Sequence, residues 1–237
     1  MTSVVTGTST DKLRPKNVFS YLWTEIDARK DSNTIASALQ HALKNFDPSK
    51  ETVRLFADGC GGQNKNANMM AMLAYWLLEE SPKHIKQIEL IFPIVGHSFI
   101  PPDRIFGLIG KDIKKMPVIV EISDYDDLIR KHSTIWKIGI DWDVFDWRTQ
   151  AKQVIKLPSS WHFEFNKAKR FIFYRKDKNV LVKEYIEVRL LTIIKYYFLV
   201  ELINFLAKLT SAEPESTDSA KNTEEKENHK TYIDECE

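Results

Sequence analysis

The chain has 237 residues, of which 43% are hydrophobic, and its formal net charge is +1. This length can bury one full-sized hydrophobic core with smaller appendages. The two cysteines, Cys60 and Cys236, lie too far apart for a disulfide framework or a zinc motif, which favours a reducing, intracellular compartment. The sequence does not open on a basic segment followed by an apolar run, so no secretory signal is predicted.

The charge is unevenly distributed along the chain. Residues 211–237 hold nine acidic residues and three lysines, a net −6, so the preceding 210 residues carry +7. A basic body with an acidic tail is compatible with a polyanionic partner such as DNA, and also with an ordinary solvated basic surface. We expect the tail to be disordered because it is charged and poor in aromatic residues.

The first half of the sequence alternates between patterns typical of strands and of helices. Residues 1–16 show neither pattern and are expected to be irregular. The predicted strands cover Val18–Thr24, Val53–Ala57 and Ile85–Gly96, and the predicted helices begin after an N-cap at Ser32 or Asn33, at Asn66 and at Pro102. The helix from Asn66 to Glu80 is apolar nearly all round and is expected to be buried. This alternation predicts an α/β core over residues 17–120, with a largely parallel sheet flanked by helices.

The second half is less regular. Residues 121–188 are expected to form a small α+β appendage, with a basic β-hairpin that turns at "KDKN". The apolar segment 189–210 is predicted to be a helix, and its core 190–209 could dock on a protein partner. Lys195, Glu201 and Asn204 lie inside this segment, and since a central charge costs about 3 kcal/mol on insertion scales, a membrane span is disfavoured.

One stretch raises the question of chemistry: "RLFADGCGGQNKN", Arg54 to Asn66. Three interpretations of this stretch are possible: a phosphate-binding loop, a metal-binding carboxylate, or a plain tight connection between strand and helix. The Walker A and dinucleotide patterns each lack required residues, because Asn64 stands where a glycine is needed and no Ser or Thr follows Lys65. The phosphate-loop interpretation is therefore the weakest of the three.

A metal site would need a second acid near Asp58. Asp103, in "GHSFIPPD", follows the next predicted strand, and His97 lies between that strand and Asp103. Ligand sites of open α/β sheets gather at the carboxyl ends of strands, and two carboxylates with a histidine could hold Mg²⁺ or Mn²⁺. In the competing interpretation, Asp58 only caps the turn and Asp103 only complements a helix dipole.

These segments resemble a known family. "DGCGGQNKN" and "GHSFIPPDRIFGLI", with "SYLWTE", "SNTIASAL" and "VFDWRTQ", resemble a transposon-derived domain of unassigned function that is widespread in insect and cnidarian genomes. That domain is similar to an RNase H-like core of the DDE transposase or integrase type. The resemblance covers about residues 12–188 and implies a mixed sheet flanked by helices.

The resemblance also implies roles for individual residues. Asp58 matches the acid after the fourth strand of such a core, and Asp103 best matches the acid on the later helix. Both would be catalytic metal ligands, with His97 beside them. Gln63, Asn64 and Lys65 match the family's QNKN motif and could orient a phosphate or stabilise the turn. Lys169, Arg170 and Arg175 in the basic hairpin could contact a phosphate backbone, or the hairpin could be an ordinary solvated surface.

The first acid of a DDE triad is not found upstream of Val18, where only Asp11 is present. The expected core is therefore incomplete at its N-terminus. Two hypotheses follow: a fragment or decayed copy of a metal-dependent transposase, or a non-catalytic module that binds DNA or a protein. An intracellular location is expected, and a DNA partner would favour the nucleus.

Overall fold

The computed structural model describes residues 1–6, 11–45, 49–93, 100–118, 121–155, 165–176, 179–185 and 198–200. Its strands are β1 (Thr2–Val5), β2 (Val18–Leu22), β3 (Thr52–Phe56), β4 (Gln87–Ile91), β5 (Thr134–Lys137), β6 (Arg170–Lys176), β7 (Asn179–Tyr185) and β8 (Phe198–Val200). Its helices are η1 (Pro15–Asn17), α1 (Ser32–Lys44), α2 (Ala67–Tyr75), η2 (Trp76–Glu80), α3 (Pro101–Ile113), α4 (Ile122–Arg130) and α5 (Trp147–Val154).

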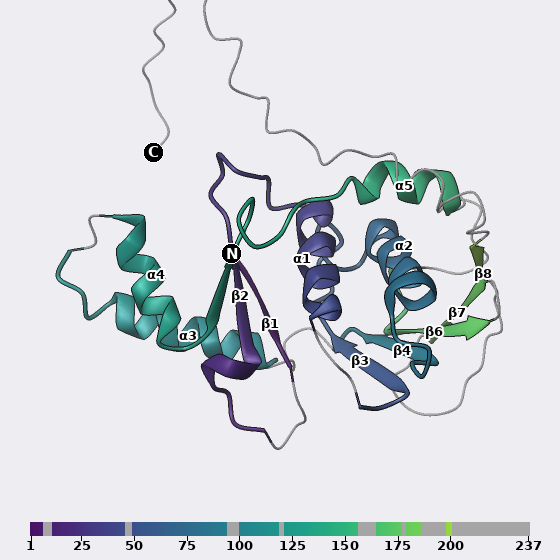
Figure 1. Cartoon of the computed structure of the whole chain (residues 1–237), viewed down its shortest axis with the longest axis horizontal. Coiled ribbons are helices and arrows are strands. Elements are labelled where there is room, and N and C mark those ends of the chain that lie inside the picture. Colours follow the sequence, from purple (N-terminus) through teal and green to yellow (C-terminus); the bar gives the residue numbers. More distant parts are fainter. Residues whose placement is uncertain are drawn as a thin grey trace, which may run out of the picture.

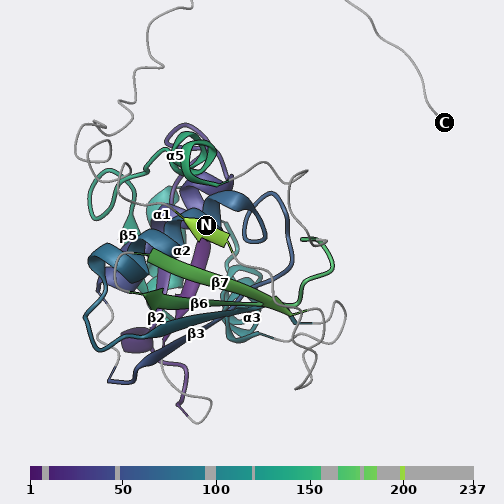
Figure 2. The ribbon, with the colours of Figure 1, turned by 90° about the vertical axis from the view of Figure 1, so that its right-hand side faces the viewer.

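The strands form two mixed sheets flanked by helices (Figure 1), which confirms the predicted α/β class. In the first sheet, β2 pairs antiparallel with β1 and parallel with β5. In the second, β3 and β4 are parallel, and β6, β7 and β8 add to β4 in antiparallel order. Figure 2 shows β6 and β7 of this second sheet side by side, with β3 at the sheet's edge.

The prediction of one largely parallel sheet over residues 17–120 was wrong. β2 and β3 lie in different sheets, because β2 takes β5 as its parallel partner and β4 takes β6 as its antiparallel partner. Both of these partner strands lie beyond residue 120. Strands from residues 17–120 and from residues 121–188 therefore share both sheets, so the expected boundary at residue 120 is not a boundary between sheets.

Helix α1 lies between the two sheets (Figure 1) and is buried along most of its length. Toward the first sheet, Ala38 and Ala42 pack with Tyr21 of β2. Toward the second, Ile35 and Leu43 belong to the main core. The sequence placed the N-cap at Ser32 or Asn33, but it is Asp31, whose carboxylate accepts the N–H groups of Asn33 and Thr34.

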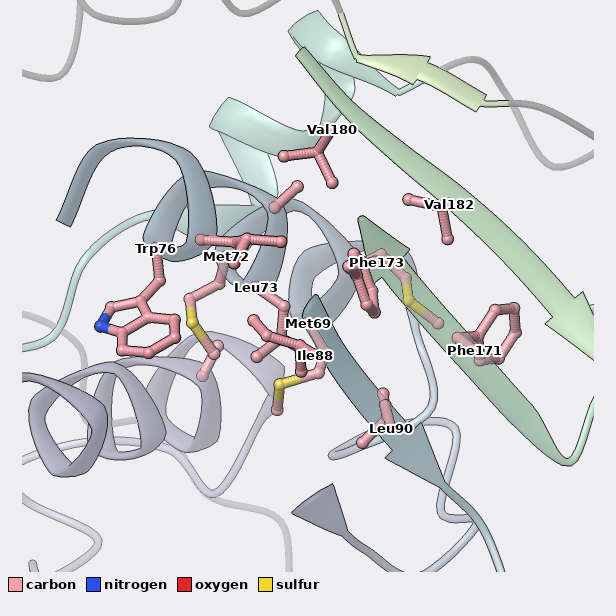
Figure 3. Packing of buried hydrophobic residues seen from close by; sticks show 14 of the residues in the cluster. Met69, Met72, Leu73, Trp76, Ile88, Leu90, Phe171, Phe173, Val180 and Val182 are labelled. Carbon is pink, nitrogen blue, oxygen red and sulfur yellow. The ribbon is translucent and has the colours of Figure 1, made fainter. Parts of the chain in front are cut away.

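The main core forms where α2 packs on the second sheet (Figure 3). Helix α2 is apolar on almost every side, and all of its residues from Asn68 to Ala74 are buried, as the sequence predicted. Its partners are alternate residues of three neighbouring strands, since residues two apart point to one face of a sheet. The core includes Met69, Met72, Leu73, Trp76, Ile88, Leu90, Phe171, Phe173, Val180 and Val182.

Helices α3 and α4 cover the outer face of the first sheet. Ile105 and Ile109, one turn apart on α3, pack with Ile129 of α4 and with Val18 and Ile135 of the sheet. Helix α5 packs on α1 and α2, on the side away from the second sheet (Figure 1). None of the helices in the described ranges is long and apolar enough to span a bilayer.

Three predictions about the ends of the chain have clear outcomes. The basic hairpin is confirmed, since β6 and β7 pair antiparallel with Lys176 opposite Asn179. Residues 1–16 were expected to be irregular, but β1 pairs with β2 through Thr2 to Val5. The prediction of a helix at 189–210 was wrong for Phe198–Val200. These residues form β8, because they pair with the edge of β7 that β6 does not occupy. The rest of that segment and residues 211–237 lie outside the described residues.

Candidate functional site

Asp58 lies two residues after β3, at the edge where the parallel strands β3 and β4 both end. It is exposed, and its Oδ1 accepts hydrogen bonds from the Cys60 N–H (3.1 Å) and from the Asn64 side chain (2.7 Å). Within the described residues, its Oδ2 accepts no hydrogen bond. The exposed carboxylate is therefore held in place through one of its two oxygens.

The loop after Asp58 is tightly closed. The Cys60 carbonyl accepts the N–H groups of Gln63, Asn64 and Lys65, at 3.2, 2.8 and 3.0 Å. Asn66 then caps α2, because its Oδ1 accepts the Met69 N–H at 3.0 Å. These are the contacts of a tight βα connection, and they occupy the Asn64 side chain and one of the N–H groups that a phosphate would otherwise meet at the start of α2.

Lys65 is used inside the fold. It is only 8% exposed, and its Nζ donates to the carbonyl oxygens of Asn166 (2.6 Å) and Ala168 (2.7 Å). The ammonium also lies over the Phe92 ring, 5.3 Å from its centroid. Burial, helped by the nearby Lys169 charge, lowers the pKa of Lys65 below its usual range. A lysine held this way cannot reach a phosphate without giving up these bonds.

Asp103 is the third residue of α3 and closes a capping box with Ile100. Its Oδ2 accepts the Ile100 N–H at 3.1 Å, and the residue is exposed. Its helix is anchored on the first sheet through Ile105 and Ile109, whereas Asp58 follows a strand of the second sheet. No described contact joins the two acids, so their pairing around one ion stays a prediction. Each has the turn-capping or helix-capping role that the plain structural interpretation gave it.

The donor chemistry of the two acids suits Mg²⁺ or Mn²⁺, which prefer carboxylate oxygens. Asp58 is the better candidate because two donors fix one of its oxygens, whereas a single N–H group binds the Asp103 carboxylate. His97, the third predicted member, lies outside the described residues. Within the described ranges, no three His, Cys, Asp or Glu residues are grouped closely enough to hold a metal ion.

The basic hairpin divides its cations between the fold and the surface. Arg170 forms an ion pair with Glu89 (2.9 Å), which Arg54 also contacts at 3.2 Å. Glu89 is only 5% exposed although it lies on the face of β4 opposite the core, and sequence patterns did not point to it. Three cross-strand charges thus tie β3, β4 and β6 together.

The Arg175 side chain binds main-chain carbonyl groups. Its guanidinium donates to the carbonyl oxygens of Leu78 (3.2 Å) in η2, of Ser81 (3.1 Å) directly after η2, and of Ile85 (3.0 Å) in the connection to β4. The last carbonyls of a helix lack partners within the helix, and a planar guanidinium can satisfy several at once. Of the predicted nucleic-acid contacts, Gln63 and Lys169 have no described side-chain hydrogen bond.

Comparison with known proteins adds the family to this geometry. Residues 1–186, from before β1 to the end of β7, match DUF7869, described as a domain of unknown function. The chain belongs to this family. The match includes both sheets apart from β8, and it contains Asp58, Asp103 and the loop between β3 and α2. No curated protein and no solved structure shows significant similarity to the chain.

Proposed function

We propose that the chain is a transposase-derived domain of RNase H-like, DDE-type ancestry. In this proposal it is a fragment or decayed copy whose ancestor cleaved and transferred DNA strands with Mg²⁺ or Mn²⁺. The observation that carries the proposal is the position of Asp58, exposed at the carboxyl end of β3 beside the parallel β4. Such edges gather ligand sites in α/β sheets.

The local contacts of Asp58 support a role in holding a cation. Two donors fix Oδ1, so the carboxylate enters a coordination sphere with little loss of side-chain freedom. A bound Mg²⁺ would polarise a phosphodiester and activate a water or hydroxyl. Asp103 is the second proposed ligand, and Asp11, the acid before β2, lies in the connector after β1 rather than within a strand. We also propose that the protein acts on DNA in the nucleus.

The test is Mn²⁺ binding by calorimetry, followed by cleavage of a labelled DNA duplex. Asp58→Asn keeps an oxygen for the Cys60 N–H but removes the charge, and we expect it to weaken Mn²⁺ binding about tenfold or more. Asp103→Asn should weaken binding by a similar factor if both acids share one ion. Asp127→Asn, at an exposed position on α4, is the matched control. Equal Mn²⁺ affinity of the unaltered chain and Asp58→Asn would refute the metal site.

The runner-up is a non-catalytic DNA-binding module. One observation favours it: Lys169 and Lys176 on the hairpin make no described side-chain hydrogen bond or ion pair, whereas Lys65, Arg170 and Arg175 are engaged in the fold. We expect DNA affinity to fall with rising salt, and replacement of both lysines by Met to reduce the salt slope by about 2. A salt-independent affinity would contradict contact with the phosphate backbone.

A further inference from the structure

His41 joins helix α1 to the two parallel strands of the first sheet. Its Nδ1 lies 3.0 Å from the Tyr21 hydroxyl on β2, and its ring packs edge-on against the Trp136 ring of β5, with the centroids 4.6 Å apart. Tyr21 is only 1% exposed and belongs to the apolar cluster that α1 forms with this sheet. The imidazole therefore lies where the helix meets both strands.

The contacts of the other ring nitrogen call for a neutral imidazole. Asn45 directly follows α1, and its side-chain nitrogen donates to the His41 carbonyl oxygen at 2.9 Å. The same nitrogen lies 3.1 Å from His41 Nε2. An amide nitrogen can only donate, so with the amide in this orientation Nε2 accepts, and the ring proton is placed on Nδ1, which donates to the Tyr21 oxygen.

A second proton on the ring would break this arrangement. It would put an N–H group on Nε2 opposite the NH₂ group of Asn45, so that two donors would face each other. Turning the amide over would bring its oxygen against the His41 carbonyl oxygen, which the amide nitrogen now binds. In either case Asn45 loses a hydrogen bond at the C-terminal end of α1.

The ionisable groups that act on His41 lie on α1, on β2 and after β5. Lys44 on the helix opposes a positive ring, whereas Asp141, in the turn after β5, favours one. The Tyr21 phenol stays neutral, because burial raises its pKa well above the ordinary value. Burial of His41 is the largest influence, and it lowers the pKa of the imidazole below the ordinary value of 6.5. The end of a helix favours a cation, so a direct measurement is the first test.

We propose that Tyr21, His41 and Asn45 form a pH-sensitive contact between α1 and the first sheet. The contact is intact while the imidazole is neutral, and it breaks when Nε2 takes up a proton. A histidine in the unfolded chain takes up its proton more readily than His41 does in the fold. The unfolding free energy should therefore fall as the pH drops from about 6.5 through the lower pKa of folded His41. Because α1 packs on both sheets, this loss should reach the second sheet as well.

The first test is an NMR titration of the histidine rings of the full-length chain in metal-free buffer. The His41 ring, assigned through its contact with the Trp136 ring, should titrate below pH 6.5. Asn45→Asp offers a carboxylate that can accept an Nε2–H group, so it should raise the pKa of His41 above that of the unaltered chain. A pKa of 6.5 or higher for His41 in the unaltered chain would overturn the proposal.

The second test is urea unfolding at about pH 7.5 and about pH 5.5, on either side of the ordinary histidine pKa. Between these values the unfolding midpoint of the unaltered chain should fall further than that of His41→Gln, because glutamine takes up no proton. His84→Gln, at an exposed position after η2, is the matched control and should fall as far as the unaltered chain. Equal falls for the unaltered chain and His41→Gln would overturn the proposal, even if His41→Gln were less stable at both pH values.

Discussion

The ammonium nitrogen of Lys65 lies 2.7 Å from the carbonyl oxygen of Ala168, which is 103 positions away in the sequence. Lys65 is the last residue of the loop that follows β3. Ala168 lies two residues before Arg170, the first residue of β6. This bond, with the one to Asn166, joins the candidate metal loop to the base of the hairpin. The loop is therefore held by the fold as well as by its own turns.

Lys65→Met should destabilise the protein by about 2 kcal/mol. The substitution keeps the apolar stem but removes the donor from two carbonyl groups, and a hydrogen bond to a charged group contributes about 1.5–3 kcal/mol. Lys169→Met is the matched control and should cost less than about 0.5 kcal/mol, as is usual for a surface change. Urea unfolding measures both values. Equal midpoints for the two variants would show that Lys65 does not hold the loop.

Arg175→Met should also cost about 2 kcal/mol, because it leaves the carbonyls of Leu78, Ser81 and Ile85 without their donor. Arg175→Lys should recover only part of this loss, since one ammonium cannot reproduce the planar fork of a guanidinium. Lys176→Met, at the next and exposed position of β6, serves as control. Guanidinium unfolding monitored by tryptophan fluorescence provides the comparison. A fully stable Arg175→Lys variant would contradict the capping role.

Asn33→Asp should destabilise the protein at neutral pH and recover in acid. Asn33 Nδ2 donates to Asp146 Oδ1 at 3.2 Å, and the variant places a second carboxylate there. Burial tends to raise the pKa of Asp146, but hydrogen bonds from Thr149 and Asn33 outweigh it, so the pKa lies below its ordinary value. The lowered pKa of Asp146 therefore stabilises the folded protein at pH values above the ordinary pKa of an aspartate. This stabilisation is lost as the pH falls through the pKa of Asp146 in the folded protein.

Asn33→Ala separates the charge from the hydrogen bond. It removes the same donor without adding a carboxylate, so its cost should change less with pH than that of Asn33→Asp. We expect about 1–2 kcal/mol for the added repulsion at pH 7. Unfolding free energies from pH 3 to pH 7 test this expectation, and parallel pH profiles of the two variants would exclude the proposed repulsion.

Glu184 should make the protein less stable as the pH rises. It is only 3% exposed, on the core face of β7, and burial raises its pKa above the ordinary value of 4.5. The folded state then holds a proton that the unfolded state releases, so the unfolding free energy falls as the pH rises from about 4.5 through the raised pKa. Glu184→Gln should remove this pH dependence of the unfolding free energy. A difference in unfolding free energy between Glu184→Gln and the unaltered protein that stays constant from pH 4 to pH 8 would contradict the prediction.

Local sequence patterns predicted the elements better than their partners. Helix α1, the buried helix α2 and the hairpin of β6 and β7 follow from periodicity and from turn and capping residues, which act over a few positions. Strand pairing depends on contacts between distant residues, and nothing near Val18 indicates that its strand would choose β5 over β3. The sequence patterns therefore predicted one sheet where the structure has two.

The candidate site was predictable in its position but not in its contacts. Asp58 could be located because a strand, a glycine-rich turn and a helix follow one another in sequence. The engagement of Lys65, Arg170 and Arg175 could not, because their partners are backbone carbonyls or a glutamate more than 80 positions away. A cation in a basic stretch has the same sequence signal whether it faces solvent or caps a helix.

Helix α1 has a consequence for how the chain can be divided. It supplies one apolar side to each sheet, so removing either sheet would leave a row of alanine, isoleucine or leucine side chains in water. Neither sheet is an autonomous folding unit, and a protease cut near residue 120 would not liberate two stable pieces. Unfolding should proceed as a single all-or-none event in which both sheets are lost together.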